Sequence, residues 1–89
     1  MKYRELGKTG LKVSEIGLGA EWLERHNEEE VKAVIDCCED YGINVLDCWM
    51  SEPNVRTNIG KALKGKREKW IIQGHFGSTW QDGQYVRTR

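Results

Sequence analysis

The chain has 89 residues, which limits it to one domain. Its 14 Lys and Arg residues balance 14 Asp and Glu residues, and this zero net charge excludes nucleic-acid binding that depends on a general excess of positive charge. Apolar residues make up 38% of the chain, which is typical of a folded domain. No apolar run approaches the roughly 20 residues that cross a membrane, and residues 1–5 lack the apolar region of a secretory signal, so we expect a cytoplasmic protein.

The cysteines predict neither a disulfide framework nor a metal site. Cys37 and Cys38 are adjacent, and Cys48 stands apart from both. An odd number of cysteines without a signal peptide is typical of reduced thiols in a reducing compartment. The C-x-x-C spacing of structural zinc sites is missing, and we therefore expect no metal site in these residues.

The N-terminal quarter of the chain predicts short strands. Residues 3–13 carry the turn residues Gly-Lys-Thr-Gly at their centre, which favours a short hairpin. Residues 16–19, Ile-Gly-Leu-Gly, are consistent with a short buried strand whose glycines allow a close approach to the backbone.

A helix is predicted to begin at Asn27. The Asn27 side chain can accept hydrogen bonds from the free N–H groups of the first turn, and Glu30 occupies the capping-box position. Gly42 is placed to end the helix. Apolar residues at helical spacing mark one face between these ends: Val31, Val34, Ile35, Cys38 and Tyr41.

The rest of the chain predicts a strand, a helix and another strand. Residues 43–48 are apolar and β-branched, as in a buried strand, and Pro53 suits the first position of a helix. Residues 70–76 predict a further strand, whereas residues 78–89 carry no pattern that we can assign. The apolar face of the second helix is formed by Val55, Ile59, Ala62 and Leu63.

Strands that alternate with helices predict a parallel sheet with right-handed crossovers. Two helices cover one face of such a sheet at most, although parallel strands are normally buried on both faces. The outer strands would also present open edges. The sequence therefore predicts an α/β domain whose sheet is only partly covered by these residues. A stand-alone βαβαβ domain is the less favoured alternative.

Three stretches resemble the start of an aldo-keto reductase: residues 3–19 (Tyr-Arg-Glu-Leu-Gly-Lys-Thr-Gly-Leu-Lys-Val-Ser-Glu-Ile-Gly-Leu-Gly), residues 41–47 and residues 58–65. The resemblance implies a (β/α)8 TIM barrel, a fold that typically needs about 250 residues. Residues 1–89 would then be a single partial domain. It would contain the N-terminal hairpin followed by β-α-β-α-β, and the missing C-terminal part of the barrel would be its partner.

The resemblance implies an oxidoreductase that transfers hydride between NAD(P)H and a small-molecule carbonyl, with NADP(H) as the usual cofactor. The full-length parent would be the enzyme, and the fragment of 89 residues alone would be inactive. The Asp-Cys-Trp-Met stretch that ends the second strand also resembles a branch with a ferredoxin-like iron–sulfur segment. That segment would lie outside these residues.

Family members use a tyrosine as general acid, tuned by a lysine that pairs with an aspartate. Asp47 matches the aspartate, but Glu52 stands at the tyrosine position and His75 at the lysine position. The resemblance also places Gly19 and Ala20 under the nicotinamide. We therefore take Asp47, His75 and Glu52 as candidate catalytic residues, and Gly19, Ala20 and Asp47 as candidate cofactor-binding residues.

Strand alternation supports a pairing of Asp47 with His75. Val45 and Asp47 share one strand face, and Gln73 and His75 share another, so the two side chains can meet across neighbouring strands. A carboxylate beside an imidazole favours the imidazolium and fixes its tautomer, which suits a general acid. Structural roles remain open: Asp47 bonding to backbone, His75 at the rim, and Glu52 capping the helix that begins at Pro53.

Trp22, Trp49 and Trp80 each follow a predicted strand, where substrate loops of a barrel lie. Aromatic walls suit a small-molecule pocket, and general packing is the equal alternative. Trp70 is the first residue of a predicted strand and is expected to pack in the core.

Because both the tyrosine and the lysine are replaced, two alternatives to an enzyme stay open. One is a non-catalytic barrel that binds a cofactor or partner, and the other is a truncated module without independent activity.

Overall fold

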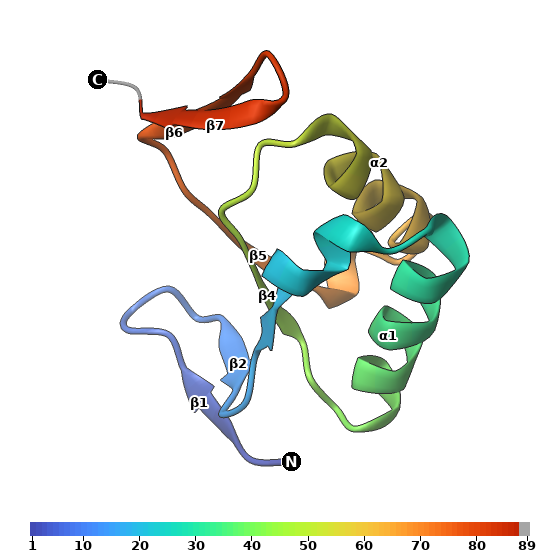
Figure 1. Cartoon of the computed structure of the whole chain (residues 1–89). Coiled ribbons are helices and arrows are strands. Elements are labelled where there is room, and N and C mark those ends of the chain that lie inside the picture. Colours follow the sequence, from blue (N-terminus) through green and yellow to red (C-terminus); the bar gives the residue numbers. More distant parts are fainter. Residues whose placement is uncertain (88–89) are drawn as a thin grey trace.

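The computed structural model describes residues 1–87 (Figure 1). All the strands and helices predicted up to residue 76 are present. In chain order the elements are β1 (Tyr3–Glu5), β2 (Lys12–Ser14), β3 (Leu18–Gly19), the 3-10 helix η1 (Ala20–Arg25), α1 (Glu28–Asp40), β4 (Val45–Cys48), α2 (Pro53–Ala62), the 3-10 turn η2 (Arg67–Lys69), β5 (Ile71–Gly74), β6 (Ser78–Gln81) and β7 (Gln84–Arg87).

A parallel sheet in the order β3-β4-β5 forms the centre of the fold. Leu46 of β4 pairs with Leu18 of β3 and Ile72 of β5, and this row belongs to the apolar core. Helices α1 and α2 lie together on one side of the sheet (Figure 1). The opposite side carries Val45 and Asp47, which are only half-buried. The predicted covering of a single sheet face is therefore confirmed.

The core lies between the two helices and the sheet. Fully burying one large aliphatic side chain contributes about 1.5–3 kcal/mol. The largest fully buried side chains are Ile35, Leu46, Met50, Val31 and Val55.

Helix α1 begins and ends as its sequence predicts. The Asn27 side chain accepts a hydrogen bond from the Glu30 N–H at 2.8 Å, and the Asn27 N–H donates to Glu30 Oε1 at 3.1 Å. Gly42 follows the helix with φ of +81°, a conformation that favours glycine. The predicted apolar face is wrong at two positions. Tyr41 is 71% exposed, and Val34 is 38% exposed and lines an open hollow beside Leu18 and Gly19 of β3 instead of packing in the core.

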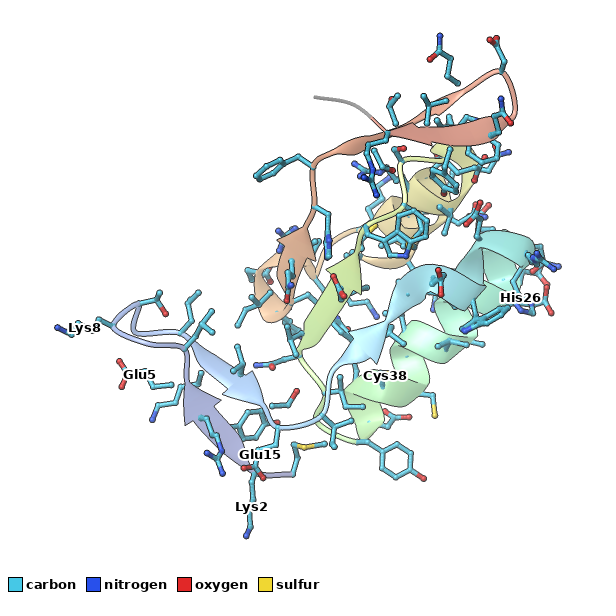
Figure 2. The ribbon with its side chains drawn as sticks, turned by 60° about the vertical axis from the view of Figure 1, so that its left-hand side comes forward. Lys2, Glu5, Lys8, Glu15, His26 and Cys38 are labelled. Carbon is cyan, nitrogen blue, oxygen red and sulfur yellow. The ribbon has the colours of Figure 1, made fainter. Side chains whose placement is uncertain are left out.

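The predicted N-terminal hairpin is present as β1–β2, and it lies at the N-terminal ends of the parallel strands. The Tyr3 hydroxyl donates to the Gly42 carbonyl at 2.6 Å. Asn44, just before β4, accepts from the Ser14 N–H and donates to the Lys12 carbonyl, both at 2.8 Å. Figure 2 shows Lys8 at the far tip of this hairpin. These bonds attach the hairpin to the bottom edge of the sheet.

A second hairpin, β6–β7, follows β5 where the sequence analysis assigned no structure. Asp82 and Gly83 form its turn with φ of 52° and 78°. Two successive positive φ values are typical of a type I′ turn, for which Asp-Gly is a preferred pair. Trp80 pairs with Tyr85 across the two strands. The Asp-Gly pair at residues 82 and 83 is the sequence feature from which this hairpin could have been predicted.

The structure also bears on the expected reduced cysteines and on membrane-spanning helices. Cys37, Cys38 and Cys48 are free thiols, and burial raises the pKa of Cys38 and of Cys48 above the ordinary value. No helix within residues 1–87 has the length and apolar character needed to cross a membrane.

Lys66 joins α1 to the segment after α2. Its ammonium donates to Asp36 at 2.7 Å and to Glu39 at 2.9 Å, and Glu39 also accepts from the Trp70 indole at 2.7 Å. These hydrogen bonds raise the pKa of Lys66. Burial opposes ionisation of Glu39, but the bonds from Lys66 and Trp70 outweigh it and lower the pKa of Glu39. Bonds from Lys32 and Lys66 lower the pKa of Asp36.

We predict that Lys66→Met destabilises the intact protein at neutral pH and flattens its sensitivity to acid. Carboxyl groups with lowered pKa contribute stability above their ordinary values of 3.8 for Asp36 and 4.5 for Glu39, and this contribution is lost as pH falls through the lowered values. Urea denaturation at neutral pH and at about pH 3 checks this. Lys69→Met, at an exposed site outside the network, is the control. Equal acid sensitivity of the two variants would contradict the prediction.

The isolated chain is predicted to be partly unfolded or self-associated. Within residues 1–87 one face of the central sheet has no covering layer, and β3 and β5 are edge strands. Sedimentation and thermal unfolding followed by circular dichroism test this. A monomer with one sharp cooperative transition would show that the expectation is wrong.

Candidate functional site

The carboxyl ends of the three parallel strands form one edge of the sheet. Gly19, Cys48 and Gly74 end β3, β4 and β5 there. The segments that leave this edge are η1, residues 49–52 and the β6–β7 hairpin (Figure 1). In barrels of parallel strands, this is the edge that carries the active site.

Asp47 and His75 contact each other at this edge. Asp47 pairs in register with Gln73, and His75 follows two residues later on the same face of the chain. His75 Nε2 lies 2.5 Å from Asp47 Oδ1, with the two side chains 42% and 45% exposed. The predicted meeting of these residues is thus observed. When Nε2 carries the proton and donates to Asp47, Nδ1 is free for a second partner.

A hollow of about 440 Å³ lies beside this pair. Phe76 is fully exposed, and the Ser78 hydroxyl is shielded from solvent without a hydrogen-bond partner in the described part of the chain. The hollow therefore combines an imidazole, an aromatic wall and a cationic side chain. Its lining is Trp49, His75, Phe76, Gly77, Ser78 and Arg87.

Glu52 holds the start of α2. Its Oε1 accepts from the Asn54 N–H at 3.0 Å, and its Oε2 accepts from the Val55 N–H at 2.9 Å. The residue is only 7% exposed, and Pro53 follows as the first helical residue. Both carboxylate oxygens are therefore engaged with backbone. Of the two interpretations considered for Glu52, the geometry corresponds to the capping one.

Gly19 and Ala20, the two further candidate cofactor-binding residues, differ in their exposure to solvent. Gly19 pairs with Asp47 across β3 and β4 and is exposed, and a Cβ placed on it would meet nothing within 4 Å. The space next to Gly19 is therefore open on the face that carries Asp47. Ala20 is fully buried in the core, so its methyl group is not available to a ligand.

The three candidate pocket tryptophans line one hollow of about 460 Å³. Tyr85 lies among them, with its ring centroid 4.7 Å from those of both Trp49 and Trp80. The sequence analysis missed Tyr85, which an assignment of the Asp-Gly hairpin would have placed opposite Trp80. Because Trp49 lines this hollow and the one beside His75, the two hollows share a wall.

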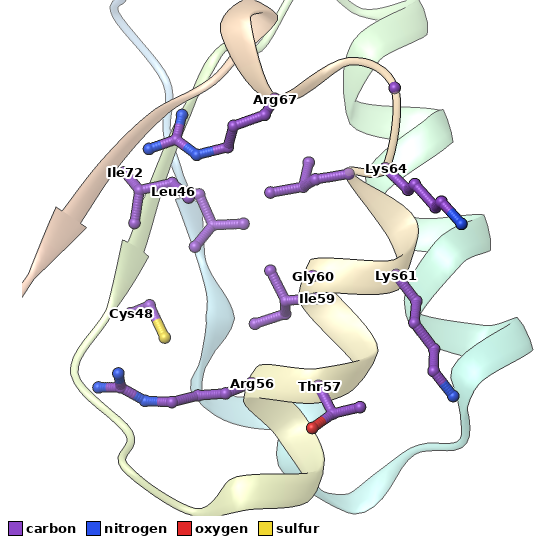
Figure 3. Close-up of a pocket in the computed structure, with 12 residues that line it drawn as sticks. Leu46, Cys48, Arg56, Thr57, Ile59, Gly60, Lys61, Lys64, Arg67 and Ile72 are labelled. Carbon is purple, nitrogen blue, oxygen red and sulfur yellow. The ribbon is translucent and has the colours of Figure 1, made fainter.

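A larger hollow of about 610 Å³ lies on the helix side of the sheet (Figure 3). Leu46, Ile59 and Ile72 form its apolar floor between α2 and the strands, and Arg56 and Arg67 lie at its margin. None of the candidate site residues lines it. It is the space beside the edge strand β5 in which a further packing element would fit.

Comparisons with known proteins agree with this architecture. No family model matches the chain. A protein named as a probable voltage-gated potassium channel beta subunit from Arabidopsis thaliana is 44% identical over 69 residues, which cover 72% of this chain and 21% of the relative. The uncharacterized oxidoreductase YqkF of Bacillus subtilis (strain 168) is 31% identical over 85 residues, which cover 93% of this chain and 28% of the relative.

Solved structures of aldo-keto reductases resemble this chain in both sequence and fold. A Pseudomonas aeruginosa protein assigned to the aldo-keto reductases superposes with a TM-score of 0.81 at 33% identity, over 97% of this chain and 35% of that structure. The chain thus spans about a third of that structure. The resemblance to the N-terminal part of an aldo-keto reductase and the incomplete barrel are both confirmed.

We predict that Glu52→Gln lowers the free energy of unfolding of the intact protein by about 1 kcal/mol, because the variant loses one of two accepted N–H bonds and the charge at the helix start. Urea denaturation measures the difference. Glu68→Gln, at an exposed position in η2, is the matched control and should change stability little. Equal stabilities of the two variants would argue against the capping role.

Proposed function

We propose that this chain, which has the sequence and the fold of the N-terminal part of an aldo-keto reductase, supplies part of the active site of an NAD(P)H-dependent carbonyl reductase. The Asp47–His75 contact carries the proposal. It lies at the carboxyl edge of the strands, where such barrels place their chemistry. Its two positions match the family's aspartate and lysine.

His75 is the proposed proton donor. In the imidazolium form, the Nε2–H bonds to Asp47 while the Nδ1–H remains available to a carbonyl oxygen. After that proton is transferred, the neutral ring keeps its Nε2–H and its bond to the carboxylate. Asp47 therefore orients the ring and holds one tautomer throughout the step.

The proposed place of the cofactor is beside Asp47. Gly19 leaves open space there, and its exposed backbone can lie against a flat nicotinamide. A bound NAD(P)H would supply the hydride to the carbonyl carbon. Its phosphate groups need binding elements from the later strands of a barrel, which are not among residues 1–89.

Glu52 is poorly placed to replace the family's tyrosine. A proton donor must be free to contact the carbonyl, and both Glu52 oxygens accept backbone N–H bonds at the start of α2. This leaves His75 as the proton donor of the proposed site.

A non-catalytic barrel that binds a cofactor or a partner is the second candidate function. Two points support it: the resemblance implies that Glu52 and His75 replace the family's tyrosine and lysine, and Glu52 caps α2. One relative is named as a subunit of a potassium channel, so partner binding is a function to test in this chain as well.

We predict that His75→Ala lowers carbonyl reduction by about 100- to 10,000-fold, the usual contribution of a general acid. The measurement is NADPH oxidation by the intact protein with a panel of aldehydes and ketones. His26→Ala removes the other histidine, which is exposed and lies before α1, and should leave the rate unchanged.

The outcomes separate the two candidate functions. Turnover that survives in His75→Ala would assign the proton transfer to another residue. Tight NADPH binding without turnover of any carbonyl would instead support the non-catalytic barrel. Failure to bind NADPH at all would remove the oxidoreductase proposal.

A further inference from the structure

The hollow that Trp22, Trp49 and Trp80 share with Tyr85 has the form of an aromatic cage. Its rings come from three separate segments: η1, the loop after β4 and the β6–β7 hairpin. The Tyr85 ring is tilted by 48° to Trp49 and by 75° to Trp80. At a centroid separation of 4.7 Å, Tyr85 packs against both tryptophans, and Trp22 lines the same hollow with 71% of its surface exposed.

Carboxylates lie among the rings. Glu21 and Glu24 of η1 line the hollow together with one guanidinium, that of Arg25, so the charged lining is negative on balance. The faces of aromatic rings are themselves electron-rich. Both features lower the electrostatic potential inside the hollow, and both attract a cation.

Tyr85 stays a neutral phenol in this setting. Burial raises the pKa of Tyr85 to about 12, and the nearby Glu24 carboxylate acts in the same direction. Its hydroxyl is shielded from solvent and has no hydrogen-bond partner within residues 1–87. The ring therefore contributes a π face, not a charge, to the wall.

We propose that this hollow binds an organic cation, a quaternary ammonium group in particular. A methylated ammonium group is bulky and cannot donate strong hydrogen bonds, so ring faces and carboxylates bind it better than hydrogen-bonding groups do. The hollow of about 460 Å³ is large enough for such a group.

The position of the hollow also indicates a substrate class, and this step rests on the proposed carbonyl reductase function. Trp49 forms a wall of this hollow and of the one beside His75. A short molecule with its ammonium group among the tryptophans would direct its other end toward the Asp47–His75 pair. The substrate would then be a small carbonyl compound that carries a quaternary ammonium group.

Calorimetric titration of the intact protein with choline tests the cation site without cofactor or turnover. The comparison ligand is the isosteric alcohol in which a neutral carbon replaces the nitrogen. We expect choline to bind about 3- to 30-fold more tightly, the range that cation–π attraction provides. Equal affinities would overturn the proposal, because an apolar pocket alone would explain them, and so would no binding of either ligand.

Two substitutions with opposite expected signs sharpen the test. Glu24→Gln removes a negative charge and should weaken choline binding, whereas Arg25→Gln removes a positive charge and should strengthen it. Trp80→Leu keeps an apolar side chain but removes the ring face, and it should abolish the preference for choline over the neutral alcohol. Tyr41→Ala removes an exposed ring on α1 and is the control. Unchanged affinities in all three hollow variants would place the binding elsewhere.

The results also separate this inference from the proposed function. Carbonyl reduction that depends on His75, combined with no preference for choline, would overturn the cation site alone. A clear preference for choline without NADPH turnover would keep the cation site and remove the assigned substrate class.

Discussion

The alternation of side chains along β4 decides both the core and the site. Leu46 and Cys48 point to the helices and are buried, whereas Val45 and Asp47 belong to the open face. A shift of the strand register by one residue would exchange these two sets. The apolar burial that stabilises the helices therefore also holds Asp47 on the face where His75 reaches it, and no separate interaction is needed to aim the carboxylate.

The segments above the strands are fixed by packing and capping. Glu52 begins α2 with two backbone hydrogen bonds, and this sets the course of residues 49–52. Tyr85 packs between Trp49 and Trp80 and attaches the β6–β7 hairpin to the same loop. Glu52 is thus a structural carboxylate. The chemistry proposed for the chain rests instead on His75 and its contact with Asp47.

The uncovered surfaces show what a complete barrel would have to supply. The open sheet face is the interior of a barrel, the groove beside Ile72 is a place for a further helix, and β3 and β5 are edges that need partner strands. Each of these surfaces is costly for an isolated chain, since edges expose unpaired backbone groups and grooves expose apolar area.

The features that the sequence determined by itself are those encoded within a few neighbouring residues. The capping box of Asn27 and Glu30, the turn at Gly42 and the strand alternation that assigns Asp47 and His75 each to a strand face all follow from local hydrogen bonding or periodicity. The turn of the β6–β7 hairpin was equally local, in its Asp-Gly pair, but was not recognised. Only the tertiary structure decided the exposure of Val34 and Tyr41, the burial of Ala20 and the packing of Tyr85 against Trp49. Burial depends on partners far away in the chain, whose positions no local pattern specifies.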